Sequence, residues 1–163
     1  MVFVMSTSSK KPRQHLRANE EKWTPALMES GWTAIPSIIL EKQQALRLDP
    51  LDLNILLQLA RYWWVADKPP YPSVQTIAES VGKSRSTVQL RIREMEKDGL
   101  IRRVPRYHSK GGGQQTNAYR FDGLIEAATP FAEEKQQLEK EKESADRRRL
   151  RRKRPKHIRL VEE

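Results

Sequence analysis

Cysteine is absent from the 163-residue sequence, which excludes disulfide bonds and thiolate metal sites and favours a reducing cytoplasm. Histidine is scarce: His15, His108 and His157 are far apart, and none is paired with carboxylates at the spacing of a metal site. No serine occupies a nucleophile elbow. We therefore expect no metal, no cofactor and no enzymatic activity.

Long apolar stretches are also missing. No run approaches the roughly 18 residues that a membrane span needs. The N-terminal letters MVFVM are too short for the core of a signal peptide, and Met5 is an alternative start of translation. We therefore expect a protein that does not enter a membrane.

Hydrophobic residues make up only 37% of the chain and charged residues 32%, so one core cannot extend over the whole length. Both ends are polar and charged. We predict three parts: a flexible arm over residues 1–22, a folded domain over residues 23–130, and a charged helical or disordered tail over residues 131–163.

The chain is strongly basic, with a net charge of +10 and a pI of about 10.0. This balance favours a polyanionic partner, nucleic acid first and an acidic membrane surface second. The basic residues are densest between Arg147 and Arg159, where nine lysines and arginines stand without an acidic residue. The alternative is that this tract only keeps the protein soluble.

Four segments carry apolar residues at helical spacing, and each follows a residue that can cap a helix. The predicted helices are 38–47 after Ser37, 50–65 after Asp49, 74–80 after Ser73, and 85–98 after Ser84. Gly82 and Gly99 stand where the end of a helix needs a left-handed backbone. Capping also explains Asp49 and Asp52 better than catalysis does.

The pattern changes after Gly99. Segments 100–107 and 117–121 read as two short strands joined by the loop 108–116. A short helix over 124–128 should end before Pro130. The tryptophans are expected to pack in the core and at a hinge, and they are Trp23, Trp32, Trp63 and Trp64. The expected fold class is mainly α with a small β-hairpin.

Ala78, Gly82 and Val88 place a small residue on one helix, a glycine in the turn and an apolar residue on the next helix. Together with the hairpin, this pattern resembles the winged helix-turn-helix of bacterial DNA-binding proteins. The earlier segments ESGWTAIPSIIL and LDPLDLNILLQLARYWW resemble the leading helices of winged-helix proteins from bacterial mobile elements, including plasmid and phage replication and regulatory proteins. The resemblance covers about residues 31–121. It implies a winged helix-turn-helix fold, double-stranded DNA as partner, and a bacterial cytoplasmic protein associated with the nucleoid or a plasmid.

Arg91 departs from the pattern, because related helices more often have a small residue there. We expect it either to loosen the packing or to reach the DNA backbone.

If Val88, Ile92 and Met95 face inward, the opposite face of the 85–98 helix is free to enter the major groove. There, arginine pairs with guanine, glutamine with adenine, and an apolar carbon can touch a thymine methyl. The candidate base contacts are Arg85, Ser86, Gln89, Leu90 and Arg93. The candidate phosphate contacts at the helix start are Lys83, Ser84 and Thr87. The alternative is a solvated helix face in a winged helix that binds protein.

Two further basic segments are candidates for contact with the DNA backbone. In the wing, which is the predicted hairpin of residues 100–121, they are Arg102, Arg103, Arg106, His108 and Lys110, and the alternative is a disordered surface loop. In the tail, sequence-independent contacts are expected from Arg147, Arg148, Arg149, Arg151, Arg152, Lys153 and Arg154. Alternatively, the acidic stretch 133–146 shields this basic tract or docks a partner protein.

These observations predict a sequence-specific double-stranded DNA-binding protein, and most simply a transcriptional repressor that occupies a promoter. A homodimer would give two-fold DNA sites, and the aromatic helix 50–65 is the predicted contact surface. The alternatives are a plasmid or phage replication or maintenance factor that binds repeated sites, and a protein-binding winged-helix scaffold.

Overall fold

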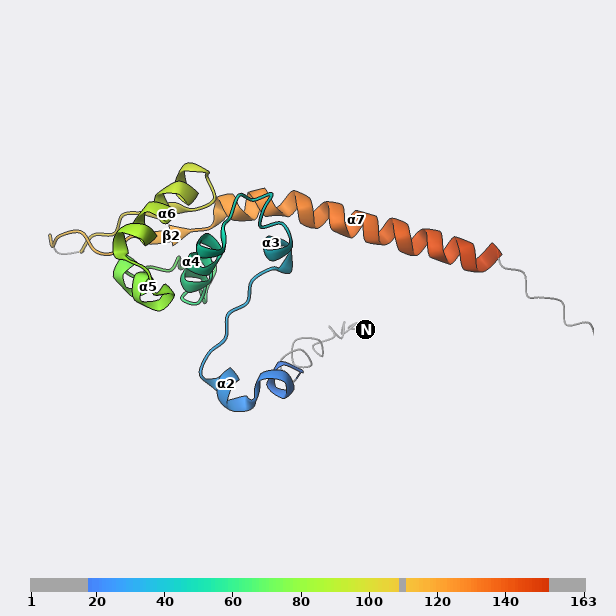
Figure 1. Cartoon of the computed structure of the whole chain (residues 1–163), viewed down its shortest axis with the longest axis horizontal. Helices are drawn as coiled ribbons and strands as arrows, with labels where there is room; N and C mark the ends of the chain where they lie inside the picture. The colour runs from blue at the N-terminus through green and yellow to red at the C-terminus, as the bar shows by residue number, and fades with distance from the viewer. Residues whose placement is uncertain (1–17, 109–110, 153–163) are drawn as a thin grey trace, which may run out of the picture.

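The computed structural model describes residues 18–108 and 111–152 (Figure 1). Residues 18–23 are helical, although the sequence suggested an arm without periodicity as far as residue 22. The elements that follow are α2 Pro25–Glu29, α3 Ser37–Glu41, α4 Pro50–Ala60, α5 Val74–Val81, α6 Arg85–Lys97, β1 Arg102–Val104, β2 Ala118–Arg120 and α7 Asp122–Arg152. The fold is mainly helical with a small antiparallel hairpin, which confirms the predicted winged helix-turn-helix class.

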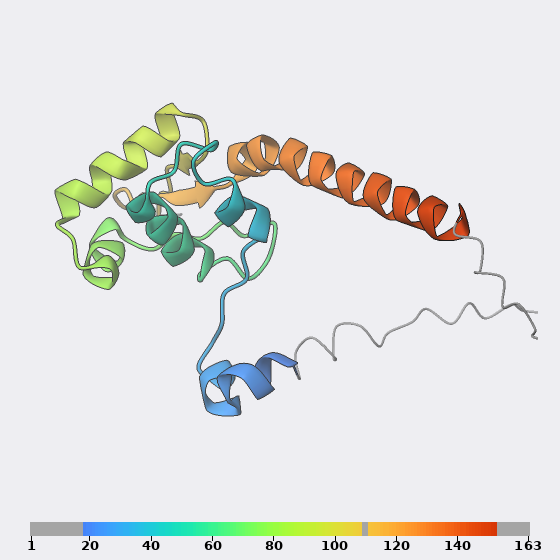
Figure 2. The same cartoon turned by 45° about the vertical axis from the view of Figure 1, so that its right-hand side comes forward.

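The core lies where α4, α5 and α6 meet under the hairpin (Figure 2). Its most deeply buried apolar side chains come from each of these elements and from β2: Ile55, Leu56, Leu59, Ile77, Val88, Ile92 and Tyr119. Trp63 stacks on Phe121, with ring centroids 5.0 Å apart and planes 14° apart. The domain is therefore held by one continuous apolar cluster that fixes α6 on α4 and α5.

The turn between α5 and α6 forms as the sequence predicts. Ser73 and Ser84 each accept a hydrogen bond from the backbone N–H three residues on, at 3.0 Å and 3.1 Å, and so cap α5 and α6. Gly82 ends α5 with φ of 63°, a left-handed conformation that costs glycine little. These three residues confirm that the two helices are joined by a tight turn.

The strands of the wing are shorter than predicted. Arg102 pairs with Arg120, and Val104 with Ala118, so regular pairing covers only three residues on each strand. Leu100 and Ile101 were assigned to the first strand, but both side chains are buried below the hairpin. The Leu100 N–H donates to the Met95 carbonyl at 2.9 Å, and the Leu100 carbonyl accepts from the Leu124 N–H at 2.8 Å, so these backbone groups bond to α6 and α7 and not to a strand.

The wing is also tied to the segment that precedes α5. The Tyr119 N–H donates to the Pro70 carbonyl at 2.8 Å, and the Thr116 hydroxyl donates to the Tyr71 carbonyl at 2.9 Å. The free edge of β2 is thereby partly covered by residues 70–71. The base of the wing is thus anchored on two sides, to β1 and to this segment.

The predicted helix 38–47 is wrong in its second half and in its cap. α3 ends at Glu41, Pro36 is its N-cap residue, and residues 42–47 form turns. Leu46 and Leu48 are both buried, yet residues two apart on a helix point in nearly opposite directions. The chain therefore leaves the helical conformation after Glu41, and Arg47 adopts a left-handed backbone with a φ of 57°, so that both leucines reach the core.

The prediction that a helix ends before Pro130 is wrong, because α7 is a single helix of 31 residues with Pro130 inside it. An interior proline costs roughly 3 kcal/mol by removing one hydrogen bond and crowding the preceding turn. Strong helix formers fill the sequence after Pro130, and the first turns of α7 are held by packing of Leu124 and Ala128 in the core. Packing and propensity together outweigh the local penalty.

Only one tryptophan packs as predicted. Trp63 lies against the core, whereas Trp23, Trp32 and Trp64 are 59%, 46% and 71% exposed. Trp23 and Trp32 flank α2, which has no buried residue and lies apart from the core in Figures 1 and 2. Trp64 follows Trp63 directly, but its side chain is turned to solvent while that of Trp63 packs against the core.

The predicted dimer surface on residues 50–65 is wrong for the apolar face of α4. Ile55, Leu56 and Leu59 are at most 1% exposed, because this face is the centre of the chain's own core. A second copy could reach it only by opening the domain. Dimerisation through the rest of this segment, where Tyr62, Trp64 and Val65 are exposed, stays a prediction.

No helix within residues 18–108 and 111–152 is long and apolar enough to cross a membrane.

Candidate nucleic-acid interface

Helix α6 has one buried face and one polar face. Val88, Ile92 and Met95 are at most 2% exposed and pack against α4 and α5. The side chains on the other face are exposed at Arg85, Ser86, Leu90 and Arg93, and Gln89 is half-buried. The predicted inward stripe is therefore confirmed. Of the side chains proposed to contact bases, four lie on the outer surface and Gln89 lies at its border.

The start of α6 is built from hydroxyl groups. The Ser84 hydroxyl caps the helix and lies 2.9 Å from the Ser86 hydroxyl and 2.8 Å from the Thr87 hydroxyl. Lys83 and Arg85 flank this cluster and are exposed. Cationic side chains and the N-terminus of a helix attract the same anion, so this end of α6 is suited to a phosphate group.

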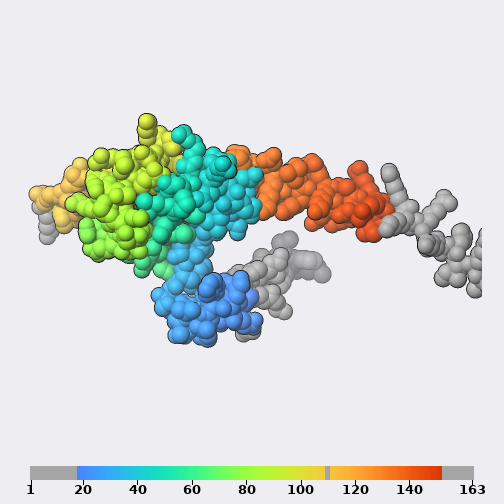
Figure 3. Space-filling model, in the orientation of Figure 1, coloured from blue at the N-terminus to red at the C-terminus, as the bar shows by residue number. Residues whose placement is uncertain are grey.

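α5, α6 and the wing share one end of the molecule, as the space-filling view shows, and α7 leaves at the other end (Figure 3). At the wing, Arg102 is exposed with a loose ion pair to Asp122 at 3.6 Å. Arg106 lies over the ring of Tyr71, 3.8 Å from its centroid. His108 is exposed and bonded to Gln115 at 2.8 Å, while Lys110 lies outside the described residues.

Arg103 differs from the other wing cations because it is bound within the domain. Its backbone N–H donates to Glu96 at 3.1 Å, and its side-chain Nε donates to the same carboxylate at 2.8 Å. Burial by itself would raise the pKa of Glu96, but the hydrogen bonds and charge of Arg103 together hold that pKa below its usual value. This pair fastens β1 to the last turn of α6.

We predict that Glu96→Gln lowers the free energy of unfolding by about 1 kcal/mol at pH 7, since bonds to a charged acceptor are lost. Because folding lowers the pKa of Glu96, the contribution is present above the pKa of the unfolded chain and is lost as pH falls through the folded-state pKa. Urea denaturation at several pH values checks this. A difference in stability between wild type and variant that did not shrink as the pH was lowered into the acid range would contradict it.

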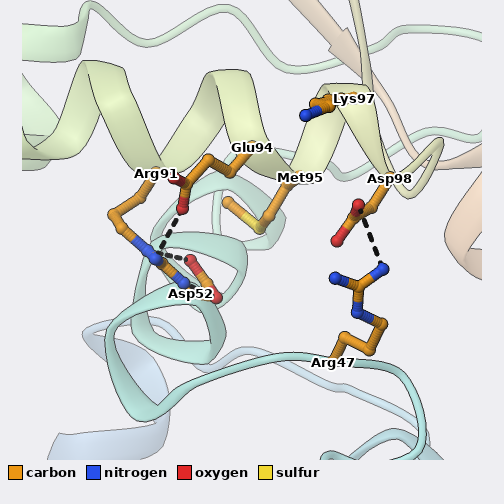
Figure 4. A pocket seen from close by; sticks show the side chains of 7 residues that line it. All are labelled: Arg47, Asp52, Arg91, Glu94, Met95, Lys97 and Asp98. Atoms are coloured by element: carbon orange, nitrogen blue, oxygen red, sulfur yellow. Dashed lines mark hydrogen bonds and ion pairs between the residues drawn. The ribbon is translucent and has the colours of Figure 1, made fainter.

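The side chain of Arg91 does not lie on the face of α6 that is proposed to contact DNA. Its guanidinium lies between α6 and the start of α4, where it binds the buried carboxylate of Asp52 through Nε at 2.8 Å and through Nη2 (Figure 4). It also lies 2.7 Å from Asp49 and 2.6 Å from Glu94. The prediction that Arg91 reaches the DNA backbone is therefore wrong, and the hydrogen bond to Asp52 raises the pKa of Arg91.

The same carboxylates also cap α4. Asp49 accepts from the Asp52 N–H at 2.8 Å, and Asp52 accepts from the Asp49 N–H at 2.9 Å, which confirms the predicted capping role. The sequence held a signal for the Arg91 pair, because Arg91 is three residues from Val88 and four from Met95 on the inward side of α6. A cation in that position requires a buried anion.

In the C-terminal part of α7, Arg147, Arg148, Arg149 and Arg151 are exposed, and Arg152 is the last residue of the helix. Lys153 and Arg154 lie outside the described residues. The structure therefore places the described tail arginines on one helix, far along the chain from α6.

Residues 46–101 match a protein family described as a helix-turn-helix domain. A possible transcriptional regulator from Methanosarcina mazei Go1 is similar in structure, with a TM-score of 0.37, 20% identity, and coverage of 64% of this chain and 85% of that chain. A mutant of MepR from S. aureus gives a TM-score of 0.37, 14% identity, and coverage of 89% and 96%. No curated protein matches the sequence. Over residues 46–101 the chain is therefore similar to helix-turn-helix domains, and α5 and α6 take the places of the two helices of the motif.

Proposed function

We propose that this protein is a sequence-specific double-stranded DNA-binding regulator of transcription that acts as a repressor by occupying a promoter. The observation that carries the proposal is the outward polar and basic face of α6, in a helix-turn-helix domain of a chain with a net charge of +10. Such a helix fits the major groove, and the positive charge favours association with the phosphate backbone.

The roles on α6 follow from where each side chain lies. Arg85 and Arg93 have the geometry for guanine, Gln89 for adenine, and Ser86 can bond to several bases. Leu90 is 52% exposed, and its side chain suits a thymine methyl group. All five lie on the outer face or its border, and they would determine base preference.

Phosphate contacts are proposed at the start of α6 and along the wing. Lys83 approaches the backbone together with the capped helix start formed by Ser84 and Thr87. Arg102, Arg106, His108 and Lys110 would follow the backbone beside the major groove. Arg103, which is bound to Glu96, would act by holding the wing at a fixed angle to α6.

The decisive experiment is to enrich binding sequences from random duplex DNA with the purified full chain. Enrichment of a defined sequence supports the proposal, whereas binding without any preferred sequence contradicts it. Mapping the sites in the source genome then separates the roles: a single site at a promoter supports a repressor, and repeated sites near an origin would indicate replication or maintenance instead.

We predict that Gln89→Ala changes the base preference at one position, with a loss of about 1–3 kcal/mol in discrimination. Gln137→Ala is the matched control, because Gln137 is exposed on α7 and is bonded to Glu141 within the same helix. Repeating the enrichment with both variants checks this. An unchanged preference in Gln89→Ala would remove the proposed adenine contact.

A further inference from the structure

Among the residues that the structure describes, the contacts that fix helix α7 to the domain lie at its beginning. Leu124 and Ala128 are buried in the core, and Phe131 packs against it. One turn later, Lys135 Nζ lies 2.7 Å from both carboxylate oxygens of Glu41 on α3. From Glu133 to Arg151 the side chains of α7 are exposed. The direction of the helix is therefore set by its first turns, and the rest projects into solvent.

The projecting part carries its arginines away from the proposed recognition surface. Arg147 is twelve residues beyond Lys135, which is about 18 Å at 1.5 Å per residue. Figures 1 and 2 both show the end of α7 on the side of the molecule opposite α6 and the wing. Because the Debye length is about 8 Å at physiological ionic strength, the two basic surfaces act independently.

The order of charges along α7 separates the two surfaces further. Residues 133–146 contain six acidic residues against three lysines, whereas residues 147–152 contain five arginines and no acidic residue. A duplex lying along the whole helix would place its phosphates against the acidic stretch, which is repulsive. The basic end therefore suits DNA that approaches it separately from the DNA held by α6.

Two simpler explanations for the arginines fall short. Cations near the C-terminus favour the helix dipole, but that effect is confined to the last turn and covers only part of the cluster. Arg147 and Arg149 form ion pairs with Glu143 at 3.6 Å and Asp146 at 3.5 Å. Such exposed pairs contribute little, so these guanidinium groups stay available to phosphates.

We propose that the arginine cluster of α7, defined as Arg147, Arg148, Arg149 and Arg151, binds a second DNA duplex segment while α6 holds the first, so that the chain bridges two segments of DNA. Its contact is with phosphates and is independent of sequence. This inference rests on the proposed function, because it requires that α6 and the wing bind DNA.

A capture experiment tests the bridge. A duplex of about 20 base pairs with the enriched site is fixed to beads and saturated with the full chain, and a labelled duplex of unrelated sequence is then added. The wild type should capture the label. Changing all four arginines of the cluster to glutamate should lower capture at least about tenfold, and changing them to lysine should preserve it, because charge and not identity is required. Both variants should bind the short site within about threefold of wild type.

The other outcomes overturn the inference. If the glutamate variant still captures the label, bridging comes from another surface or from a dimer. If the affinity of the glutamate variant for the short site falls by the same factor as the amount of captured label, the cluster contacts the DNA at the recognition site itself. If the wild type binds the site but captures nothing, the cluster serves a different partner, such as an acidic protein. These failures leave the proposed function intact, whereas failure of the wild type to prefer any sequence removes both the proposed function and the inference that rests on it.

Discussion

Replacing Gly123 by alanine should lower the free energy of unfolding by about 3 kcal/mol, the upper range for inserting a methyl group into a packed site. A Cβ at this position would lie 1.7 Å from the carbonyl oxygen of Gly99 and 2.9 Å from its carbon. Both are backbone atoms, so the start of α7 or the turn after α6 must move. The move would strain the hydrogen bond from the Leu124 N–H to the Leu100 carbonyl, now 2.8 Å long.

Two effects compete at Gly123, and their sizes decide whether alanine lowers or raises the free energy of unfolding. Alanine in a helix gains roughly 1 kcal/mol over glycine, but a contact with backbone at this distance cannot be relieved by a rotamer change. Gly113→Ala is the matched control, since a Cβ there would meet no atom within 4 Å and its φ is not positive. Chemical denaturation of both variants checks this. Equal stability of the two would show that α7 is not held against the turn at Gly99.

Replacing Arg91 by methionine should cost about 3–5 kcal/mol, because it leaves a buried carboxylate without its cation. Asp52 is only 1% exposed and binds the guanidinium through both oxygens. For a domain of ordinary stability, roughly 5–15 kcal/mol, this is a large fraction. Denaturation and the melting temperature, which should fall by more than about 10 °C at roughly 4–8 °C per kcal/mol, provide the measurement.

Arg93→Met is the matched control for Arg91→Met. Arg93 lies two residues further on the same helix but is exposed. Its loss should change stability by less than about 0.5 kcal/mol while weakening DNA binding. Adding Asp52→Asn to Arg91→Met should restore part of the stability, because the uncompensated charge is removed. If Arg93→Met proved the more destabilising of the two, the assignment of the two faces of α6 would be reversed.

Several local features of the domain could be predicted from the sequence, namely three helix caps, one turn and the inward face of α6. Asp49, Ser73 and Ser84 were expected to cap helices, and each does so through hydrogen bonds to residues three positions away. Gly82 was expected in a left-handed turn for the same local reason. The inward stripe of α6 was also predictable, since helical spacing alone puts its members on one face.

The predictions that failed depended on contacts between distant parts of the chain. Proline signals a helix end, but α7 continues through Pro130 because its first turns are packed into the core. Tryptophan favours burial, but α2 has no buried residue, and Trp23 beside it is 59% exposed. Arg91 was placed near DNA by its charge, and Asp52, its partner, is 39 residues earlier.

The sequence by itself determined the caps at Asp49, Ser73 and Ser84, the turn at Gly82 and the inward face of α6, because these arise from interactions within a few residues. Only the tertiary structure decided which arginines point outward, how the wing is fastened to α6, and where α7 carries its basic end. Those outcomes depend on packing between segments that are far apart in the chain. Local patterns of charge and hydrophobicity do not specify which of these segments come into contact.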